Sequence, residues 1–183
     1  MHRLVPGWNR HHRGAGNVPG QRGPEEGGGT MTDLYPIIRS QEFFKEFSEE
    51  DVHEVVGCAT NIVLHQGQYV FREGEPADHF YLIRHGRVSL ELFAPGRGAV
   101  VVETVEEGEP LGWSWLIPPY KWHFAARCDT LLRAIALDGQ CLRRKCEENP
   151  RLGYHLMRRM AEMMESRLQA SILRMLDLYG DKR

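Results

Sequence analysis

The sequence predicts a mainly β fold: a double-stranded β-helix of the jelly-roll kind, with short N-terminal helices and one long C-terminal helix. Two observations carry this prediction. Short apolar segments recur roughly 8–12 residues apart over residues 60–138, and glycine-rich turns separate them. After residue 150 the apolar residues recur every three or four positions, which is the period of an α-helix.

The predicted strands are short apolar segments, some of which alternate with polar residues. Val88, Leu90 and Leu92 are separated by single polar residues, as in a strand with one buried face. Glycine permits turns where a Cβ would clash, and three such fold glycines punctuate this region: Gly67, Gly74 and Gly86. The strands are predicted at 62–64, 69–71, 80–83, 88–92, 100–105 and 131–137. Together they predict a roll over about residues 60–138.

Residues 1–30 differ in composition from the rest of the chain. They contain eight glycines and three prolines, and few apolar side chains. Such a segment cannot bury enough surface to offset the entropy lost on ordering. We therefore expect a disordered tail over residues 1–32 and one domain over residues 33–183. The arginines of this segment leave a nucleic-acid-binding arm as the alternative, and Met31 would also serve as a start residue.

Two short helices are expected before the first strand. Ser40 is placed to cap one that carries several phenylalanines. Ser48 and Asp51 resemble a capping box in which Asp replaces the usual Glu or Gln. The valines that follow give the second helix an apolar face.

The segment at about 150–180 has the period of a long helix with two apolar stripes. One stripe has heptad spacing and comprises Met157, Ala161, Met164, Leu168, Ser171, Met175 and Leu178. The adjacent stripe comprises Leu152, Leu156, Met160 and Met163. Two stripes favour two partners, the roll and a second copy of the helix. We therefore expect a homodimer through this helix; a helix packed only on its own domain is the alternative.

Composition and charge are those of an ordinary globular protein. The 183 residues are 42% hydrophobic and carry a net charge of −2, so no overall attraction to nucleic acid or membrane is expected. No apolar run approaches the roughly 18 residues of a membrane-spanning helix, and the N-terminus lacks the apolar core of a signal peptide. We expect a cytoplasmic protein that is not bound to a membrane.

Residue patterns typical of metal sites and of catalysis are missing. The cysteines, at 58, 128, 141 and 146, form no Cys-x-x-Cys pair, so we expect reduced thiols. The strand region contains no His-x-His pair of the kind that cupin-type metalloenzymes use. No Ser–His–Asp or Cys–His arrangement stands out. The sequence therefore predicts a binding protein rather than an enzyme, with no catalytic residues and no metal ligands.

One longer motif is specific enough to indicate a resemblance to a known family. Residues 67–88 read GQYVFREGEPADHFYLIRHGRV, with glycines at the turns and apolar residues between them. This segment resembles the first half of the cyclic-nucleotide-binding domain of Crp/Fnr-type regulators and of the regulatory subunits of cyclic-nucleotide-dependent kinases. The resemblance extends over about residues 35–180. It implies a phosphate-binding cassette, in which a glutamate accepts from the ribose 2′-hydroxyl and an arginine and helix N–H groups hold the phosphate. It also implies that the long helix transmits the signal.

The cassette of this chain departs from the family pattern at both charged positions. Gly112 matches the cassette glycine, but Trp113 stands where the glutamate belongs and Trp122 where the arginine belongs. A cyclic phosphate without a cation loses hydration without compensation, so cAMP or cGMP is not expected to bind in the usual pose. Lys121 and Arg127 are the alternative charge partners. The resemblance assigns these ligand-binding positions: Gly112, Trp113, Ser114, Trp115, Lys121, Trp122, His123 and Arg127.

The aromatic residues of the cassette have two interpretations. In the first, the tryptophans plug the old pocket and form an inert core. In the second, they line a pocket for a flat or apolar ligand, with His123 as a polar group. Haem binding through a histidine is a further alternative, with His65, His79, His85, His123 and His155 as candidates.

The expected output is a movement of the long helix rather than reading of DNA sequence. A helix-turn-helix after that helix would need roughly 60 more residues than this chain has. Its arginines are expected on a solvated face: Arg158, Arg159, Arg167 and Arg174. We therefore predict a regulatory module in which an unidentified small molecule or protein partner shifts the helix. A structural dimer with a self-filled pocket and a genuine cAMP- or cGMP-binding signalling protein are the alternatives.

Overall fold

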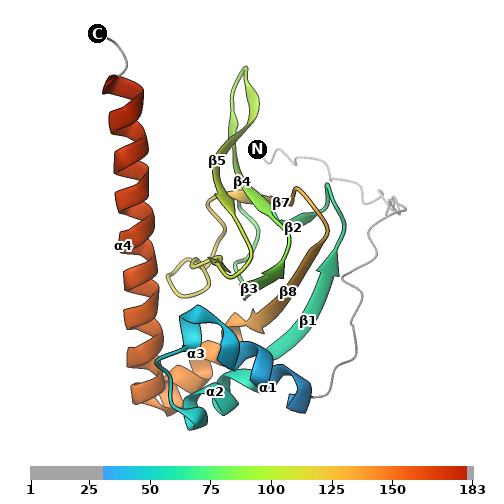
Figure 1. Cartoon of the computed structure of the whole chain (residues 1–183), viewed down its shortest axis with the longest axis vertical. Helices are drawn as coiled ribbons and strands as arrows, with labels where there is room; N and C mark the ends of the chain where they lie inside the picture. Colours follow the sequence, from blue (N-terminus) through green and yellow to red (C-terminus); the bar gives the residue numbers. More distant parts are fainter. Residues whose placement is uncertain (1–30, 181–183) are drawn as a thin grey trace, which may run out of the picture.

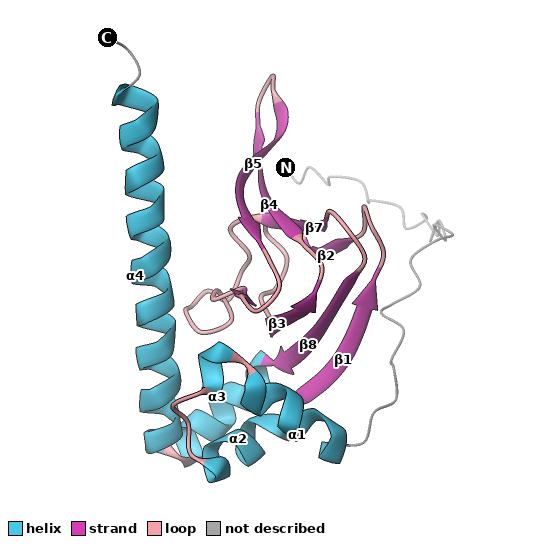
Figure 2. Cartoon of the chain, in the orientation of Figure 1, coloured by secondary structure: helices cyan, strands magenta, loops and turns pink. Residues whose placement is uncertain are grey.

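The structure is a computed structural model that describes residues 31–180, and it contains a β-roll with helices at one end and along one side (Figures 1 and 2). In chain order the elements are α1 (Met31–Ser40), η1 (Glu42–Phe44), α2 (Glu49–Val56), β1 (Ala59–Leu64), β2 (Tyr69–Phe71), β3 (His79–His85), β4 (Val88–Ala94), β5 (Gly98–Val105), β6 (Pro110–Leu111), β7 (Ala125–Cys128), β8 (Leu132–Asp138), α3 (Gly139–Glu148) and α4 (Pro150–Gly180). Short helices gather at one end of the roll, and α4 runs along its side.

The strands form two four-stranded sheets in which all pairs are antiparallel. One sheet has the order β1-β8-β3-β6 and the other β2-β7-β4-β5. In the first sheet Leu137 of β8 lies between Ala59 of β1 and Phe80 of β3. This confirms the predicted fold class, a jelly-roll-like β-roll with N-terminal helices and a long C-terminal helix. The short strands β6 and β7 are absent from the prediction.

The central strands β3 and β8 are buried on both faces, because helices cover the outside of their sheet. In β3, Phe80 and Leu82 face the helices, whereas Tyr81 and Ile83 face the interior of the roll. The strand β8 divides its side chains in the same way. A strand buried on both sides reads as a continuous apolar run, which explains the sequence of residues 80–83. Two cores result, one inside the roll and one between sheet and helices.

The first helix, α1, is absent from the prediction, and Pro36 lies inside it. It begins at Met31, two residues before the expected domain boundary, and the rest of the predicted tail, residues 1–30, lies outside the described residues. The expected cap at Ser40 is wrong. Ser40 is the last residue of α1, and its hydroxyl donates to the Ile37 carbonyl oxygen at 2.8 Å.

Ser48 caps α2, as predicted. Its hydroxyl oxygen accepts a hydrogen bond from the Asp51 amide at 3.2 Å. The Asp51 carboxylate is itself buried and faces α4, where its Oδ2 lies 3.3 Å from His155 Nδ1. The acidic residue of the expected capping box therefore joins α2 to α4.

One stripe of α4 packs on the domain, as its apolar spacing predicts. Leu152, Leu156 and Met160 are fully buried in the core beneath the sheet, and Met163 packs against its edge. This stripe fixes the first half of α4 beside α3 and the N-terminal helices.

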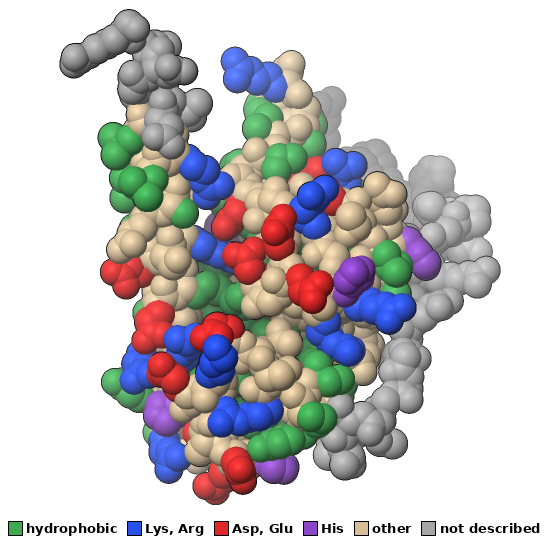
Figure 3. All heavy atoms as spheres, viewed as in Figure 1, with side chains coloured by type: hydrophobic (Ala, Val, Ile, Leu, Met, Phe, Trp, Pro, Cys, Tyr) green, Lys and Arg blue, Asp and Glu red, His purple; other side chains and the backbone are tan. Residues whose placement is uncertain are grey.

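The heptad stripe of α4 faces away from that core. Met157, Leu168 and Met175 are 54%, 61% and 50% exposed, and Met164 is half-buried. The side chain of Leu178 lies outside the described residues. Figure 3 shows hydrophobic side chains on the far part of α4 and on the β4–β5 hairpin. The described part of the chain thus leaves an apolar helix face open to solvent.

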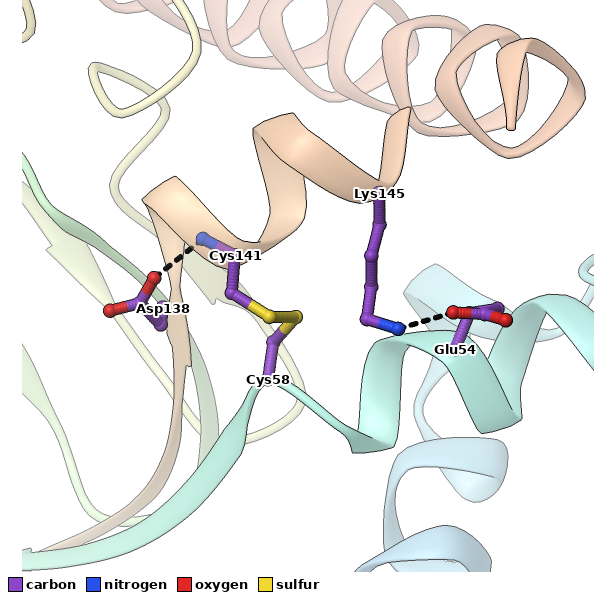
Figure 4. The surroundings of a disulfide bond; sticks show 5 residues. All are labelled: Glu54, Cys58, Asp138, Cys141 and Lys145. Atoms are coloured by element: carbon purple, nitrogen blue, oxygen red, sulfur yellow. Dashed lines mark hydrogen bonds and ion pairs between the residues drawn. A yellow bond between two sulfur atoms is a disulfide. The ribbon is translucent and has the colours of Figure 1, made fainter. Parts of the chain in front are cut away.

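Two of the four cysteines form a disulfide, so the prediction of four reduced thiols is wrong. Cys58, between α2 and β1, is bonded to Cys141 in the first turn of α3, 83 residues away in sequence (Figure 4). The Asp138 amide, which donates to the Cys58 carbonyl oxygen at 2.9 Å, brings the two segments together. Cys128 and Cys146 are free thiols. Burial raises the pKa of Cys128 to about 11 and raises the pKa of Cys146, so both stay protonated near neutral pH.

The three fold glycines have positive φ, but they differ in the space around them. A Cβ on Gly86 would lie 2.3 Å from the Leu131 carbonyl oxygen, whereas nothing lies within 4 Å of one on Gly67. We expect Gly86→Ala to lower the free energy of unfolding by about 3 kcal/mol. Gly67→Ala should lower it by about 1 kcal/mol, the cost of a left-handed alanine. Urea denaturation measures both, and equal losses would show that the Leu131 contact is unimportant.

Candidate functional site

The cassette is the loop that connects β6 to β7, and backbone hydrogen bonds hold it against the segment 74–77. The Trp122 amide donates to the Glu75 carbonyl oxygen at 3.0 Å, and the Gly74 amide donates to the Trp122 carbonyl oxygen at 2.9 Å. The Ala77 amide donates to the Tyr120 carbonyl oxygen at 2.8 Å. The conspicuous motif of residues 67–88 therefore positions the second half of the cassette.

Trp122 occupies the interior of the roll. Its side chain is 4% exposed and stacks on the Phe71 ring, with ring centroids 3.8 Å apart and an interplanar angle of 11°. The Tyr81 ring lies on another side at 6.5 Å. Gly112 makes room for the indole, because a Cβ there would lie 2.7 Å from Trp122 Cη2. Gly112 also has a φ of 85°, so both its conformation and its neighbour require glycine.

The cavity that remains beside Trp122 is small. Its volume is about 20 Å³, which is room for roughly one water molecule. Gly112, Trp113, Ser114, Trp122 and His123 are among its lining residues. These five of the eight predicted ligand positions are therefore brought together, around a space far smaller than the roughly 300–1,000 Å³ of small-molecule pockets.

Trp113 and His123 form the mouth of this cavity. Their rings stack with centroids 5.8 Å apart at 15°. Ser114 Oγ lies 3.3 Å from His123 Nδ1 and is buried, whereas the histidine is exposed. A half-buried indole, an imidazole and a hydroxyl therefore meet where the interior of the roll reaches the surface.

Trp115 lies outside this site, on the other face of the sheet. It is fully buried in the core beside the helices, with its ring 6.2 Å from that of Phe80. Arg143 of α3 holds this part of the cassette: its guanidinium donates to the Trp115 carbonyl oxygen and lies 4.3 Å from the centre of the Tyr120 ring. The three clustered tryptophans thus have three different positions.

The two alternative charge partners also lie away from the cavity lining. Arg127 points outward from β7, and its Nε donates to Glu91 Oε1 at 2.8 Å. This hydrogen bond raises the pKa of the Arg127 guanidinium. Lys121 is exposed and bridges to Pro76 through its backbone. Neither side chain is placed to neutralise an anion inside the roll.

Arg167 of α4 does line the cavity, and the expectation of a solvated position for it is wrong. Its side chain is 17% exposed, with Nη2 donating to the Pro110 carbonyl oxygen at 2.6 Å and Nε lying 3.5 Å from Glu103 Oε1. A sequence signal for this position existed. Arg167 continues the three- and four-residue spacing of the buried stripe after Met163. Its charge is paired within the domain.

The described residues contain no group of three or more His, Cys, Asp or Glu side chains that could hold a metal ion. The histidines considered as haem ligands are dispersed, since His79, His85 and His155 each face a different acidic side chain. Within residues 31–180, no helix combines the length and the apolar character needed to cross a bilayer.

Comparisons with known proteins agree with this geometry. The model of the cyclic nucleotide-binding domain family matches residues 62–149. A protein from Geobacter metallireducens, described provisionally as cyclic nucleotide-binding, has a solved structure with a TM-score of 0.66 and 28% identity; the match covers 73% of this chain and 96% of that one. The sensor domain of the transcriptional regulator DNR from Pseudomonas aeruginosa shares the fold, with a TM-score of 0.61, 19% identity, and coverage of 76% and 93%.

A curated relative shows a similar level of identity. The CRP-like cAMP-activated global transcriptional regulator of Mycobacterium tuberculosis is 27% identical over 99 residues, which are 54% of this chain and 44% of the regulator. The chain spans less than half the length of the curated relatives it matches. The two-sheet roll, the position of the cassette between β6 and β7 and the match over residues 62–149 together show that this part of the chain is a cyclic nucleotide-binding domain, with the fold of a Crp/Fnr-type sensor domain.

Proposed function

We propose that this chain is a regulatory binding module, not an enzyme, whose roll is filled by its own Trp122 instead of a cyclic nucleotide. One observation carries the proposal. Trp122 stacks on Phe71 in the interior and leaves a cavity of only about 20 Å³. A nucleotide in the usual pose would have to displace the indole, at the cost of its buried apolar contacts.

The electrostatics of the site support the same conclusion. The phosphate of a cyclic nucleotide needs a cation or several donors in a site that excludes water. Arg127 is engaged with Glu91 on the outer face of the roll, and Arg167 is engaged with Glu103. A bound phosphate would therefore have to break an existing ion pair to gain either arginine as a partner.

Calorimetric titration with cAMP and with cGMP tests the proposal directly. We expect no heat of binding and no rise in melting temperature up to millimolar nucleotide, because the interior of the roll is occupied. Micromolar binding of either nucleotide to the wild-type protein would contradict the proposal.

A matched pair of variants locates the cause. Trp122→Arg removes the indole and restores the residue type of the family pattern, whereas Trp122→Phe keeps an aromatic ring in the roll. If cAMP or cGMP binds to the Trp122→Arg variant alone, Trp122 is the residue that prevents nucleotide binding in the wild type. Equal binding by both variants would show that the size of the indole, and not the missing charge, excludes nucleotides.

We further propose that the module pairs with a second copy through the heptad stripe of α4, and that the position of α4 is its output. The support is the exposed apolar face, because Met157, Leu168 and Met175 are each at least half exposed. An apolar stripe with heptad spacing favours a second helix as its partner.

Two leucines of α4 make a matched test of pairing. Leu168 and Leu173 are both 61% exposed, but only Leu168 belongs to the heptad stripe. We expect Leu168→Glu to raise the dimer dissociation constant at least tenfold, about 1.4 kcal/mol, and Leu173→Glu to leave it nearly unchanged. Sedimentation equilibrium measures both. A monomeric wild-type protein, or equal weakening by both substitutions, would refute this pairing.

A further inference from the structure

The helix α3 contacts three parts of the molecule that are distant in sequence. Arg143 holds the cassette through the Trp115 carbonyl oxygen and the Tyr120 ring. Lys145 forms an ion pair with Glu54 of α2 (Figure 4). One residue, at position 149, separates α3 from α4. A shift of α3 would therefore reach the cassette, α2 and α4 together.

The disulfide is the covalent connection at this meeting point. Cys141 lies in the first turn of α3, where its amide donates to Asp138 Oδ1 at 2.6 Å. Cys58 immediately precedes β1, and the segment between the two cysteines contains all eight strands of the roll. The bond therefore ties the beginning of the roll to the helix that leaves it.

Leu142 of α3 is fully buried in the core with Trp115 and the valines of α2, and the other contacts that hold α3 to α2 and to the cassette are polar and partly exposed. The side chains of Lys145 and Glu54 are 20% and 43% exposed, so water screens their attraction. Tyr120, the aromatic partner of Arg143, is 36% exposed. Such contacts open with smaller free energies than the strand pairs of the core. The covalent bond is the one constraint here that a two-electron reaction removes.

The two sulfur atoms differ in access. Cys58 is 6% exposed, whereas Cys141 is half-buried, so an attacking thiolate reaches Cys141 first. The other two cysteines do not compete in exchange, because burial keeps the Cys128 and Cys146 thiols protonated and the thiolate is the reactive form.

We propose that the Cys58–Cys141 bond is a redox-sensitive lock that fixes α3 to the start of β1. A thiolate of a dithiol reductant, of the thioredoxin class, attacks Cys141 Sγ, and the Cys58 sulfur leaves and takes up a proton. The second thiol of the reductant then releases Cys141 as a thiol. The protein gains two electrons and two protons, and the reductant becomes a disulfide. With the bond open, α3 moves together with the cassette end and α4 relative to β1.

Amide hydrogen exchange of the full chain, oxidised or reduced with dithiothreitol, tests the lock. We expect reduction to speed exchange in α3 and in residues 113–120 at least roughly tenfold more than in the paired strands β3 and β8, because opening there no longer requires the roll to open. Exchange in β3 and β8 should rise only by the factor that the loss of global stability gives, and reoxidation with oxidised glutathione should restore the exchange rates of the oxidised protein. Maleimide labelling with mass measurement confirms the redox state in each sample.

Two variants complete the design. Cys58→Ser should show the fast pattern with and without dithiothreitol, whereas Cys146→Ser should respond as the wild type does. Four labelled thiols in the non-reduced protein would overturn the proposal. Unchanged exchange in α3 after reduction would also overturn it, and so would a uniform increase over the whole roll, which would indicate a structural staple. These readouts involve neither nucleotide nor dimer, so the inference goes beyond the proposed function and fails or stands separately from it.

Discussion

Trp122→Ala is expected to lower the free energy of unfolding by about 3–5 kcal/mol, the range for truncating a large buried aromatic side chain. Trp122 is 4% exposed and stacks on Phe71 with little unfilled space beside it. The surrounding side chains belong to paired strands, so they cannot collapse fully into the space that the indole leaves. Urea denaturation at neutral pH measures the loss.

Trp113→Ala is the matched control, because it removes the same side chain from the half-buried mouth of the cavity. We expect a loss of about 1 kcal/mol there, as for an average substitution. Millimolar indole should stabilise the Trp122 variant selectively, because an apolar cavity binds a ligand of matching shape and bound ligand stabilises the native state. Equal losses for both variants would mean that Trp122 does not fill the roll.

The second large effect is expected from the disulfide. The double variant Cys58→Ala, Cys141→Ala should be less stable than the oxidised wild type by about 4 kcal/mol, because the bond closes a long loop in the unfolded chain. The two cysteines are 83 residues apart in sequence, so this loss lies near the upper end of the roughly 2–4 kcal/mol that a disulfide usually contributes. For a domain of this size the change corresponds to a melting temperature roughly 8–16 °C lower. Differential scanning calorimetry under oxidising conditions measures it.

Reducing conditions provide the control for this comparison. With dithiothreitol present, the melting temperature of the wild type should fall close to that of the double variant, because the disulfide is then open. The Cys146→Ser variant, which alters a free thiol, should remain within about 1 kcal/mol of the wild type in either condition. If wild type and double variant melt together under oxidising conditions, the bond contributes nothing to stability.

Local patterns of the sequence were sufficient to predict the roll and the helices α2 and α4, but not α1 and α3. Strand alternation, glycine turns and a helical period are properties of neighbouring residues, and each specifies a backbone conformation. Ser48 is an example, because a cap and its amide partner lie three residues apart. The two stripes of α4 are another, since the helix period alone separates the buried Leu156 from the exposed Met157.

In the cassette, local sequence patterns do not determine where each tryptophan side chain lies. Trp113, Trp115 and Trp122 have the same side chain, yet one lies at the mouth of the cavity, one among the helices and one inside the roll. Their destinations depend on the turn at Gly112 and on the backbone bonds that join residues 120–122 to 74–77. A choice between plugging and lining the pocket cannot be read from aromatic composition, because both arrangements use the same residues.

The sequence by itself determined the fold class, the family resemblance and the replacement of both charged cassette positions by tryptophan, because these are properties of residue identity and spacing. Only the tertiary structure decided that Arg127 pairs outward with Glu91, that Arg167 reaches the cavity and that Cys58 bonds to Cys141. Each of these contacts joins residues far apart in the chain. Their meeting depends on how sheets and helices pack; the helix period places Arg167 on the buried side of α4 but does not say which residues it meets there.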